Sequence, residues 1–247
     1  MRRFFVPADI LGGREVALPR ELSRRLATVL RLQRGDRVLL ADGLGRDYEV
    51  EITTLTPRSV QAAVVGERAS PPEPALELVL YQSLVRPQRF ELVLEKGTEL
   101  GVARFVPLVS GRARVKAEGG SPRAERWRRI VTEAAEQCGR GRVPAVDPPA
   151  AFAEAVRTAP GLRLLPWEGE SASGGRGLRS YLRGLQLIPE AVSLFIGPEG
   201  GFAEEEAALA GEAGCVAVSL GPRVLRSETA GIVAAALVMH ELGEMGD

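Results

Sequence analysis

Two short segments constrain the fold of this chain more than any others. The first, Ile-Gly-Pro-Glu-Gly-Gly-Phe at residues 196–202, follows the apolar run 191–196, and the second, residues 220–230, follows the apolar run 215–220. Each run leads through a glycine-proline turn into a helical pattern. Glycine permits positive φ and close backbone approach, while proline stiffens a turn. Strand, tight turn and helix, used twice, predict an α/β domain with a ligand crevice at the carboxyl ends of neighbouring strands.

The longer, C-terminal part of the chain alternates between strand and helix patterns. Besides the two runs above, apolar strand patterns cover residues 76–81, 104–109 and 162–165. Helical patterns cover residues 89–100, 121–138, 151–158, 204–214 and 227–242. Such alternation predicts a mostly parallel sheet covered by helices on both faces. The Gly- and Ser-rich residues 169–178 predict an exposed, mobile loop.

The N-terminal part of the chain predicts a separate small β-barrel. Its strand patterns cover residues 2–6, 37–41, 48–54 and 60–67, and one helical pattern covers residues 18–30. Short strands at about ten-residue spacing are typical of small barrels. The proline-rich stretch at residues 70–74 predicts a linker. We therefore predict one domain over residues 1–72 and a second over residues 73–247.

The charges are sorted along a chain whose net charge is zero. Residues 1–35 carry a balance of +5, residues 101–142 a balance of +6, and residues 199–247 a balance of −7. The basic residues are almost all arginine, with 30 Arg to 2 Lys. Sorting of this kind indicates basic faces for an anionic partner on an otherwise neutral molecule.

Local signals point to a cytoplasmic protein. No apolar run is long enough to predict a membrane span, and the first residues carry no secretory pattern. The two cysteines, Cys138 and Cys215, form no disulfide framework and have no metal-ligand spacing. We therefore expect a reducing compartment, no membrane association and no metal.

Several enzyme classes are excluded by missing motifs. The dinucleotide spacing G-x-G-x-x-G and the phosphate loop G-x-x-x-x-G-K-[ST] are both absent. The one histidine, His240, lies at core-like spacing in the last helical pattern, which predicts a packed structural residue. A Ser-His-Asp triad is therefore not expected.

The two glycine-proline turns predict a site that is lined by main-chain groups. With Ile196, Leu220 and Leu225 as apolar walls, such a site suits a flat, neutral heterocycle such as adenine. Arg226 precedes the predicted helix N-cap, Ser227, so we expect its guanidinium to point into the crevice and bind phosphate or a base carbonyl. The bland alternative is a pair of tight connections without a ligand.

A cluster of cations on and before the predicted helix 121–138 favours contact with a nucleic-acid backbone. Its members are Arg112, Arg114, Lys116, Arg123, Arg126, Arg128, Arg129, Arg140 and Arg142, with Trp127 among them. The alternative is a solvated helix face. Contact with RNA or DNA is the stronger hypothesis because the cluster precedes a candidate site.

Motifs along nearly the whole chain resemble those of the RsmE-type methyltransferases of the SPOUT class. They are Arg-Arg-Phe-Phe-Val at 2–6, Asp-Gly-x-Gly at 42–45, Glu-Lys-Gly-Thr-Glu-Leu-Gly-Val at 95–102, Glu-Ala-Ala-Glu-Gln-Cys-Gly-Arg at 133–140, Ile-Gly-Pro-Glu-Gly-Gly at 196–201 and Leu-Gly-Pro-Arg-Val-Leu-Arg-Ser-Glu-Thr at 220–229. The Gly-Pro-Glu-Gly turn is shared by many SPOUT enzymes, whereas Gln-Cys-Gly-Arg and Leu-Gly-Pro-Arg-Val-Leu-Arg are more specific.

The resemblance implies a PUA-like RNA-binding β-barrel followed by an α/β SPOUT domain with a deep trefoil knot. It also implies a homodimer that uses S-adenosyl-L-methionine to methylate N3 of a uridine in 16S ribosomal RNA of the small subunit. By the same resemblance, the cofactor-binding residues are Leu165, Pro166, Ile196, Gly197, Pro198, Gly200, Gly201, Leu220, Gly221, Leu225, Thr229 and Ala230.

Methylation at N3 requires removal of the N3 proton from uracil. Arg226 is our candidate for stabilising the uracil anion, and the general base is left open among Glu99, Glu199, Glu228, a backbone group and water. The predicted catalytic residues are Arg226, Glu228 and Glu199. The predicted RNA-binding residues are Arg2, Arg3, Arg24, Arg112, Arg123, Arg126, Arg129, Gln137 and Arg140.

Two other functions are compatible with the same patterns. One is a SPOUT enzyme that methylates the ribose 2′-hydroxyl of tRNA or 23S ribosomal RNA. The other is an RNA-binding ribosome-assembly protein without catalytic activity.

Overall fold

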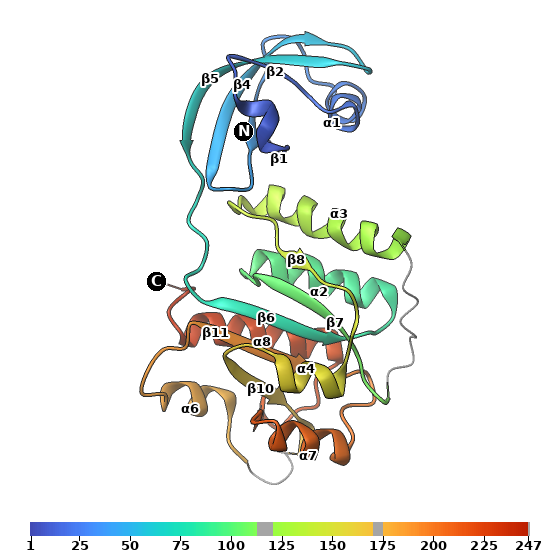
Figure 1. The fold of residues 1–247 in the computed structure, drawn as a ribbon, viewed down its shortest axis with the longest axis vertical. Helices are drawn as coiled ribbons and strands as arrows, with labels where there is room; N and C mark the ends of the chain where they lie inside the picture. The colour runs from blue at the N-terminus through green and yellow to red at the C-terminus, as the bar shows by residue number, and fades with distance from the viewer. Residues whose placement is uncertain (113–120, 170–174, 247) are drawn as a thin grey trace. The chain divides into compact units, whose positions relative to one another are not determined.

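A computed structural model describes residues 1–112, 121–169 and 175–246 of the chain (Figure 1). The chain divides into two compact units. The first contains residues 1–73 and 132–143, and the second contains residues 74–131 and 144–247. The helix α3 (Ser121–Cys138) contributes residues to both units. The predicted boundary at residue 72 falls beside the first of these divisions and stays a prediction.

The first unit is built on a five-stranded sheet with the order β1-β3-β4-β5-β2. Its strands are β1 (Arg3–Phe5), β2 (Glu15–Ala17), β3 (Arg37–Ala41), β4 (Arg46–Leu55) and β5 (Val60–Ala69). Strand β1 runs parallel to β3, and the other neighbours are antiparallel. The helical segments are η1 (Ala8–Leu11), α1 (Arg20–Arg24) and the π-helical turn η2 (Arg25–Val29). Apolar side chains from both kinds of element, such as Phe4, Leu26 and Leu40, form its core.

The turn between β3 and β4 follows from its sequence. Gly43 and Gly45 have positive φ angles of 70° and 114°, and the Asp42 carboxylate accepts the backbone N–H groups of Leu44 (2.7 Å) and Arg46 (3.0 Å). An aspartate that closes its own turn in this way needs flexible neighbours, which glycine supplies. The four predicted strands of this part are confirmed. Strand β2 and helix η1 were not predicted because three or four residues carry too little pattern.

Arg3 is a buried structural residue of the first unit. Its Nη2 lies 2.7 Å from Asp47 Oδ1, and its guanidinium also donates to the backbone carbonyl of Arg140. The Ser70 hydroxyl donates to the same carboxylate at 2.6 Å. Burial raises the pKa of Asp47, but the hydrogen bonds from Arg3 and Ser70 outweigh burial, so that pKa lies below its usual value. Arg3 is therefore buried and bonded within its own unit, and its predicted contact with RNA stays a prediction.

The second unit is built on a parallel sheet with the order β12-β10-β11-β6-β7-β8, and β9 also pairs with β7. Its strands are β6 (Glu77–Ser83), β7 (Arg104–Val109), β8 (Ala145–Val146), β9 (Ala150–Ala151), β10 (Leu162–Pro166), β11 (Ala191–Ile196) and β12 (Val216–Val218). Because β10, β11 and β12 are parallel, their carboxyl ends meet at one edge of the sheet.

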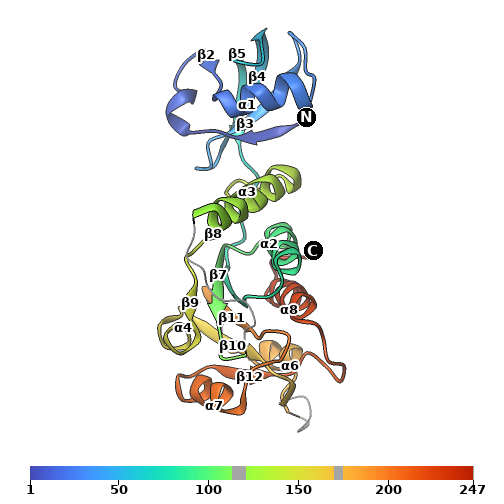
Figure 2. The same cartoon turned by 90° about the vertical axis from the view of Figure 1, so that its right-hand side faces the viewer.

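Helices cover both faces of this sheet (Figure 2). On one side lie α2 (Pro87–Glu99) and α8 (Ser227–Glu241), with α6 (Leu178–Arg183) against α8. On the other side lie α4 (Phe152–Thr158) and α7 (Glu204–Glu212). The core beneath α4 and α7 contains the stacked rings of Tyr81 and Phe195, whose centroids are 4.5 Å apart. The predicted parallel sheet with helices on both faces is therefore confirmed.

Some predictions for this unit need correction or stay open. His240 is exposed and its Nδ1 lies 3.1 Å from the Met245 carbonyl oxygen, so the packed position predicted for it is wrong. Helix α6 and strands β8 and β9 were not predicted. Of the loop predicted at 169–178, residues 170–174 lie outside the described residues. The knot implied by the family resemblance stays a prediction. Within the described parts of the chain, every helix is too short or too polar to cross a bilayer.

Candidate functional site

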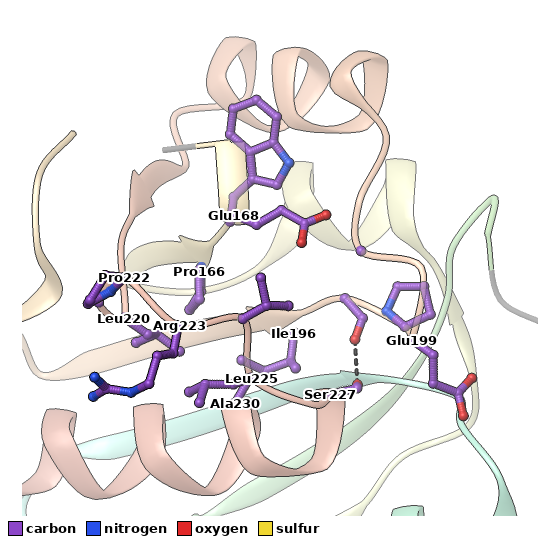
Figure 3. A pocket seen from close by; sticks show the side chains of 16 residues that line it. Pro166, Glu168, Ile196, Glu199, Leu220, Pro222, Arg223, Leu225, Ser227 and Ala230 are labelled. Carbon is purple, nitrogen blue, oxygen red and sulfur yellow. Dashed lines mark hydrogen bonds between the residues drawn. The ribbon is translucent and has the colours of Figure 1, made fainter. Parts of the chain in front are cut away.

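A cavity of about 310 Å³ lies at the carboxyl ends of β10, β11 and β12, beside the first turn of α8 (Figure 3). It is lined by Pro166, Trp167, Glu168, Ile196, Gly197, Pro198, Glu199, Gly201, Leu220, Gly221, Pro222, Arg223, Val224, Leu225, Ser227 and Ala230. Both glycine-proline turns therefore contribute to one cavity. In the view of Figure 3, Glu199 lies at the right-hand end and Arg223 at the left-hand end.

The glycines of these turns are required by backbone geometry and by space. Gly201 has a φ of 65° and Gly221 has a φ of 111°, and residues with a side chain rarely adopt such positive values. A Cβ on Gly201 would also lie 2.7 Å from Glu168 Oε1. At Gly197, which keeps a negative φ, a Cβ would lie 3.2 Å from the backbone nitrogen of Phe202. The first turn thus folds back on itself, with Gly197 close to Phe202 and Gly201 close to Glu168.

A hydrogen-bonded chain ties the first turn to the start of α8. The Ser227 hydroxyl donates to the Gly197 carbonyl oxygen, drawn as a dashed line in Figure 3. The same hydroxyl accepts a hydrogen bond of 2.9 Å from Gln82 Nε2 at the end of β6. The N-cap of α8 is Arg226, so the prediction of Ser227 as the N-cap is wrong. Ser227 instead holds the cavity turn to two elements that are distant in sequence.

An ion-pair cluster adjoins one end of the cavity. Arg89 of α2 places its Nη1 3.1 Å from Glu199 Oε1 and its Nε 3.5 Å from Glu228 Oε1. Glu199 belongs to the cavity wall, whereas Glu228 lies in the first turn of α8. Within the described parts of the chain, Glu228 Oε2 and Gln82 Oε1 are buried without a hydrogen-bond partner. Sequence reasoning did not select Arg89, because its two partners lie more than a hundred residues away.

Comparison with known proteins adds a family to this geometry. Residues 71–239 match the model of the RNA methyltransferase domain, and residues 24–65 match that of the RNA methyltransferase PUA domain. The chain is 36% identical to ribosomal RNA small subunit methyltransferase E of Synechocystis over 86% of this chain and 69% of that relative. The chain belongs to the ribosomal RNA small subunit methyltransferase E family. The Bacillus subtilis member is 27% identical over 98% of this chain and 97% of its own length.

Solved structures agree with this assignment. Methyltransferase E of Neisseria gonorrhoeae, bound to S-adenosyl methionine, has a TM-score of 0.86 and 32% identity, and the match covers 97% of each chain. A methyltransferase of Legionella pneumophila, also in complex with bound cofactor SAM, has a TM-score of 0.88 and 32% identity, with 96% of each chain covered. The SPOUT-type α/β fold preceded by a PUA-like unit, expected from the motifs, is thus confirmed.

Most of the cofactor-binding residues predicted for this methyltransferase E member meet at the cavity. Its described lining includes nine of them: Pro166, Ile196, Gly197, Pro198, Gly201, Leu220, Gly221, Leu225 and Ala230. The other three lie outside that lining. Leu165 is buried in the core, Gly200 accepts a hydrogen bond of 3.0 Å from Arg112 through its carbonyl, and Thr229 is exposed on α8.

The cavity also contains residues that were not among the individually predicted site residues. They are Trp167, Glu168, Pro222, Arg223, Val224 and Ser227, apart from the predicted catalytic Glu199. Three of them, Trp167, Pro222 and Ser227, directly follow a predicted residue, and the other three lie within two positions of one. Trp167 and Glu168 follow the end of β10, where side chains reach the carboxyl edge of the sheet.

The predicted catalytic residues occupy different environments. Glu199 lines the cavity and Glu228 is buried beside it. Arg226 is exposed and lies outside the described cavity lining, which has Arg223 as its one arginine. Glu99, a candidate general base, pairs with Lys96 at 2.8 Å near the far end of α2. These positions favour the two carboxylates held by Arg89 over Glu99.

The predicted RNA-binding residues of this family member fall into two groups. Arg2, Arg24, Arg129 and Gln137 are exposed. Others engage neighbours: Arg112 donates to the Gly200 carbonyl, Arg123 lies over the Trp127 ring at 5.8 Å, Arg126 pairs with Glu91 at 2.6 Å and Arg140 donates to Glu73 at 3.0 Å. Arg114 and Lys116 lie outside the described residues. The described residues contain no group of three potential metal ligands.

Proposed function

We propose that this protein transfers a methyl group from S-adenosyl-L-methionine to N3 of a specific uridine in 16S ribosomal RNA. The observation that carries the proposal is one cavity that both glycine-proline turns line, in a chain that belongs to the methyltransferase E family. The names of the relatives supply the small-subunit ribosomal RNA, and the motif resemblance supplies the uridine N3 position.

The cavity fits the methyl donor in its shape and chemistry. Ile196, Leu220 and Leu225 offer apolar walls to a flat adenine ring, while the turns at 197–198 and 221–222 offer main-chain hydrogen-bonding groups. An added Cβ on Gly197 or Gly201 would lie 3.2 Å from Phe202 N or 2.7 Å from Glu168 Oε1, so only glycine fits these positions of the cavity wall. When bound, S-adenosyl-L-methionine supplies an electrophilic methyl group on a sulfonium.

The residues of the chain have two tasks in this reaction. A carboxylate accepts the N3 proton of the uracil, and a cation stabilises the negative charge that develops on the ring. Glu199 and Glu228 are the carboxylates that we assign to this region, and Arg226 remains our candidate cation, with Arg223 as the alternative on the cavity wall. If Arg226 acts as such a donor, Arg226→Ala should raise the activation free energy of methylation by about 2–4 kcal/mol without unfolding the protein. The ratio of kcat/KM for the wild type and the variant measures this change.

RNA is bound, in this proposal, by the PUA-like unit and by exposed arginines of both units. The match of residues 24–65 to an RNA methyltransferase PUA domain supports the first part. The exposed side chains of Arg2, Arg24 and Arg129, together with Gln137, support the second. Ribosomal RNA is the expected anionic partner, and the bacterial cytoplasm that contains it is the expected compartment.

A homodimer is also part of the proposal. Helix α8 is apolar on nearly all sides, and a helix of this type is normally buried by other protein segments on every side. Its Ile232, Val233 and Leu237 remain partly exposed, and Val224 of the cavity wall is 81% exposed. A second copy of the chain would cover such side chains. Light scattering coupled to size-exclusion chromatography should give twice the mass of 26.4 kDa.

One experiment tests the reaction and its position. 16S ribosomal RNA or small subunits from a strain that lacks the enzyme are incubated with the protein and S-adenosyl-L-methionine, and then examined by primer extension. Methylation at N3 blocks base pairing and should stop the polymerase at one uridine. Read-through together with a mass gain of one methyl would instead indicate the ribose 2′-hydroxyl. Calorimetry without binding of the methyl donor would overturn the enzyme assignment in favour of an RNA-binding protein.

A further inference from the structure

Arg89 connects two carboxylates of the candidate site through a single guanidinium. It lies in the first turn of α2, whereas Glu199 follows β11 and Glu228 begins α8. The two contacts use different nitrogens, with Nη1 3.1 Å from Glu199 and Nε 3.5 Å from Glu228. A planar guanidinium presents its donors in a fixed fork, so it orients both partners at once. Three separate elements therefore meet at one cation.

The cluster keeps capacity to accept a proton. Two carboxylates share one guanidinium, so the three groups together carry one net negative charge. In each contact, Arg89 approaches the Oε1 atom. Glu228 Oε2 has no hydrogen-bond donor in the described part of the chain although it is buried, and such groups are uncommon in folded proteins. One proton added to Glu199 would leave the cluster neutral and keep the ion pair between Arg89 and Glu228.

The geometry points to Arg89 as a positioning residue that holds Glu199 in place as the acceptor of the uridine N3 proton. This role rests on the proposed function. The N3–H bond breaks, an O–H bond forms on the Glu199 carboxyl group, and the electron pair stays on N3. Glu228 anchors the other side of the guanidinium and so fixes the direction from which Arg89 holds Glu199.

Exposure separates the roles of the two carboxylates. The Glu199 side chain is 28% exposed and forms part of the cavity wall, so a nucleotide can reach it. The Glu228 side chain is 10% exposed and does not belong to the described lining. A proton acceptor must lie within hydrogen-bond reach of the proton that it removes. Glu199 meets that condition more directly, and Glu228 is suited to hold Arg89.

The test compares steady-state methylation by the wild-type protein with that of Arg89→Leu, Arg89→Lys and Glu199→Gln. Arg86→Leu is the matched control, because Arg86 is an exposed arginine immediately before α2 and its replacement removes the same charge. For each variant we would measure kcat and KM for the RNA, the Kd of S-adenosyl-L-methionine by calorimetry, and the thermal midpoint.

We expect Glu199→Gln to lower kcat by about 100-fold, within the usual range for loss of a general base. Arg89→Leu should lower kcat by at least about tenfold with little change in Kd for the methyl donor, and Arg89→Lys should recover part of the loss. The kcat of the double variant Arg89→Leu with Glu199→Gln should lie within about threefold of the kcat of Glu199→Gln alone. Both substitutions disable the same proton acceptor, so their effects should not multiply.

Three outcomes would overturn this role. If Arg89→Leu keeps the kcat of Arg86→Leu while the wild-type protein methylates its RNA, Arg89 does not position the base and the proposed function stands. If losses in the double variant multiply fully, the two residues act independently. A wild-type protein that leaves the RNA unmodified would instead overturn the proposed function and this role together. Should Arg89→Leu fail to fold, Arg89→Lys and the single Glu199→Gln variant still decide between these outcomes.

Discussion

Two arginines that bind carboxylates differ in how completely their networks are hydrogen-bonded and buried. In the first unit, Arg3 binds Asp47, whose carboxylate also receives the Ser70 hydroxyl, and Asp47 is 1% exposed. In the second unit, Arg89 is shared by Glu199 and Glu228, and one buried oxygen of Glu228 lacks a donor within the described residues. The first network is complete, and the second is not.

We propose that the same pairing of arginine with carboxylate serves stability in the first unit and the reaction in the second. A buried ion pair whose hydrogen bonds are all made holds its elements in one arrangement, and removal of one partner is costly. A cluster with unused acceptors contributes less to stability, but it can still accept a proton or a hydrogen bond from a ligand. We therefore expect variants in the first network to act on folding and variants in the second to act on the reaction.

The largest effect is expected at Asp47. Asp47→Ala leaves the Arg3 guanidinium buried without its partner, which should lower the free energy of unfolding by about 3–5 kcal/mol. Urea denaturation measures this loss. Arg3→Met combined with Asp47→Leu removes both charges and should restore most of it. A loss below about 1 kcal/mol for Asp47→Ala would show that the complete network contributes little to stability.

Glu228→Gln should have the opposite effect: it should slow methylation and leave stability nearly unchanged. We expect this effect to be smaller than that of Asp47→Ala. The amide keeps the size of the side chain but weakens its contact with Arg89, so kcat should fall by about tenfold. The free energy of unfolding should stay within about 1 kcal/mol of wild type, because a carboxylate with an unpartnered buried oxygen is replaced by a neutral group. The two quantities come from methylation kinetics and urea denaturation. Destabilisation comparable to that of Asp47→Ala would remove the contrast between the two networks.

Lowering the pH should change the stability contributions of two carboxyl groups of the first unit, Asp47 and Glu136, in opposite directions. The folded-state pKa of Asp47 lies below its ordinary value, so its contribution to stability is present above about pH 4 and is lost as pH falls through the folded-state pKa. Burial raises the pKa of Glu136 despite hydrogen bonds from the Phe5 N–H group and Arg25. Protonation of Glu136 therefore stabilises the folded state as the pH falls from its folded-state pKa towards the ordinary pKa of glutamate.

Unfolding free energies measured between pH 3 and pH 7 test these opposite signs. The paired variant Arg3→Met with Asp47→Leu should lose stability less steeply than wild type on acidification, since the titrating carboxylate is gone. Glu136→Gln should lose it more steeply, because it lacks the compensating protonation. Parallel curves for all three proteins would contradict both assignments.

The smallest change in stability is expected for the exposed arginines of α3. Arg126 pairs with Glu91 at 2.6 Å, but it is exposed, so its replacement should cost no more than about 1 kcal/mol. Replacing Arg123, Arg126 and Arg129 together by Ala should weaken RNA binding and reduce the slope of log K against log salt by up to about 2. Filter binding over a series of salt concentrations measures the slope. An unchanged slope would make this helix face a solvated surface.

Much of the fold and of the cavity could be predicted because the signals are local. The helix at 121–138 and the strands at 37–41, 104–109 and 191–196 have the predicted bounds, since side-chain periodicity and turn residues act over a few positions. Short elements such as β8 were missed because two residues carry no period. Leu165 and Gly200 were assigned to the cofactor site by the family resemblance, which does not reveal which atoms of a residue face a cavity.

The sequence by itself determined the two glycine-proline turns, the strands that precede them and the helices that follow. Those features depend on backbone conformation at single residues and on nearest neighbours. The tertiary structure decided which arginine is buried against a carboxylate in the first unit and which pairs with a carboxylate of the cavity wall. Arg3 and Asp47 are 44 positions apart, and Arg89 and Glu199 are 110 positions apart. Ion pairs between such distant residues arise only when the folded chain brings strands and helices together, so no local pattern could have distinguished Arg3 from Arg89.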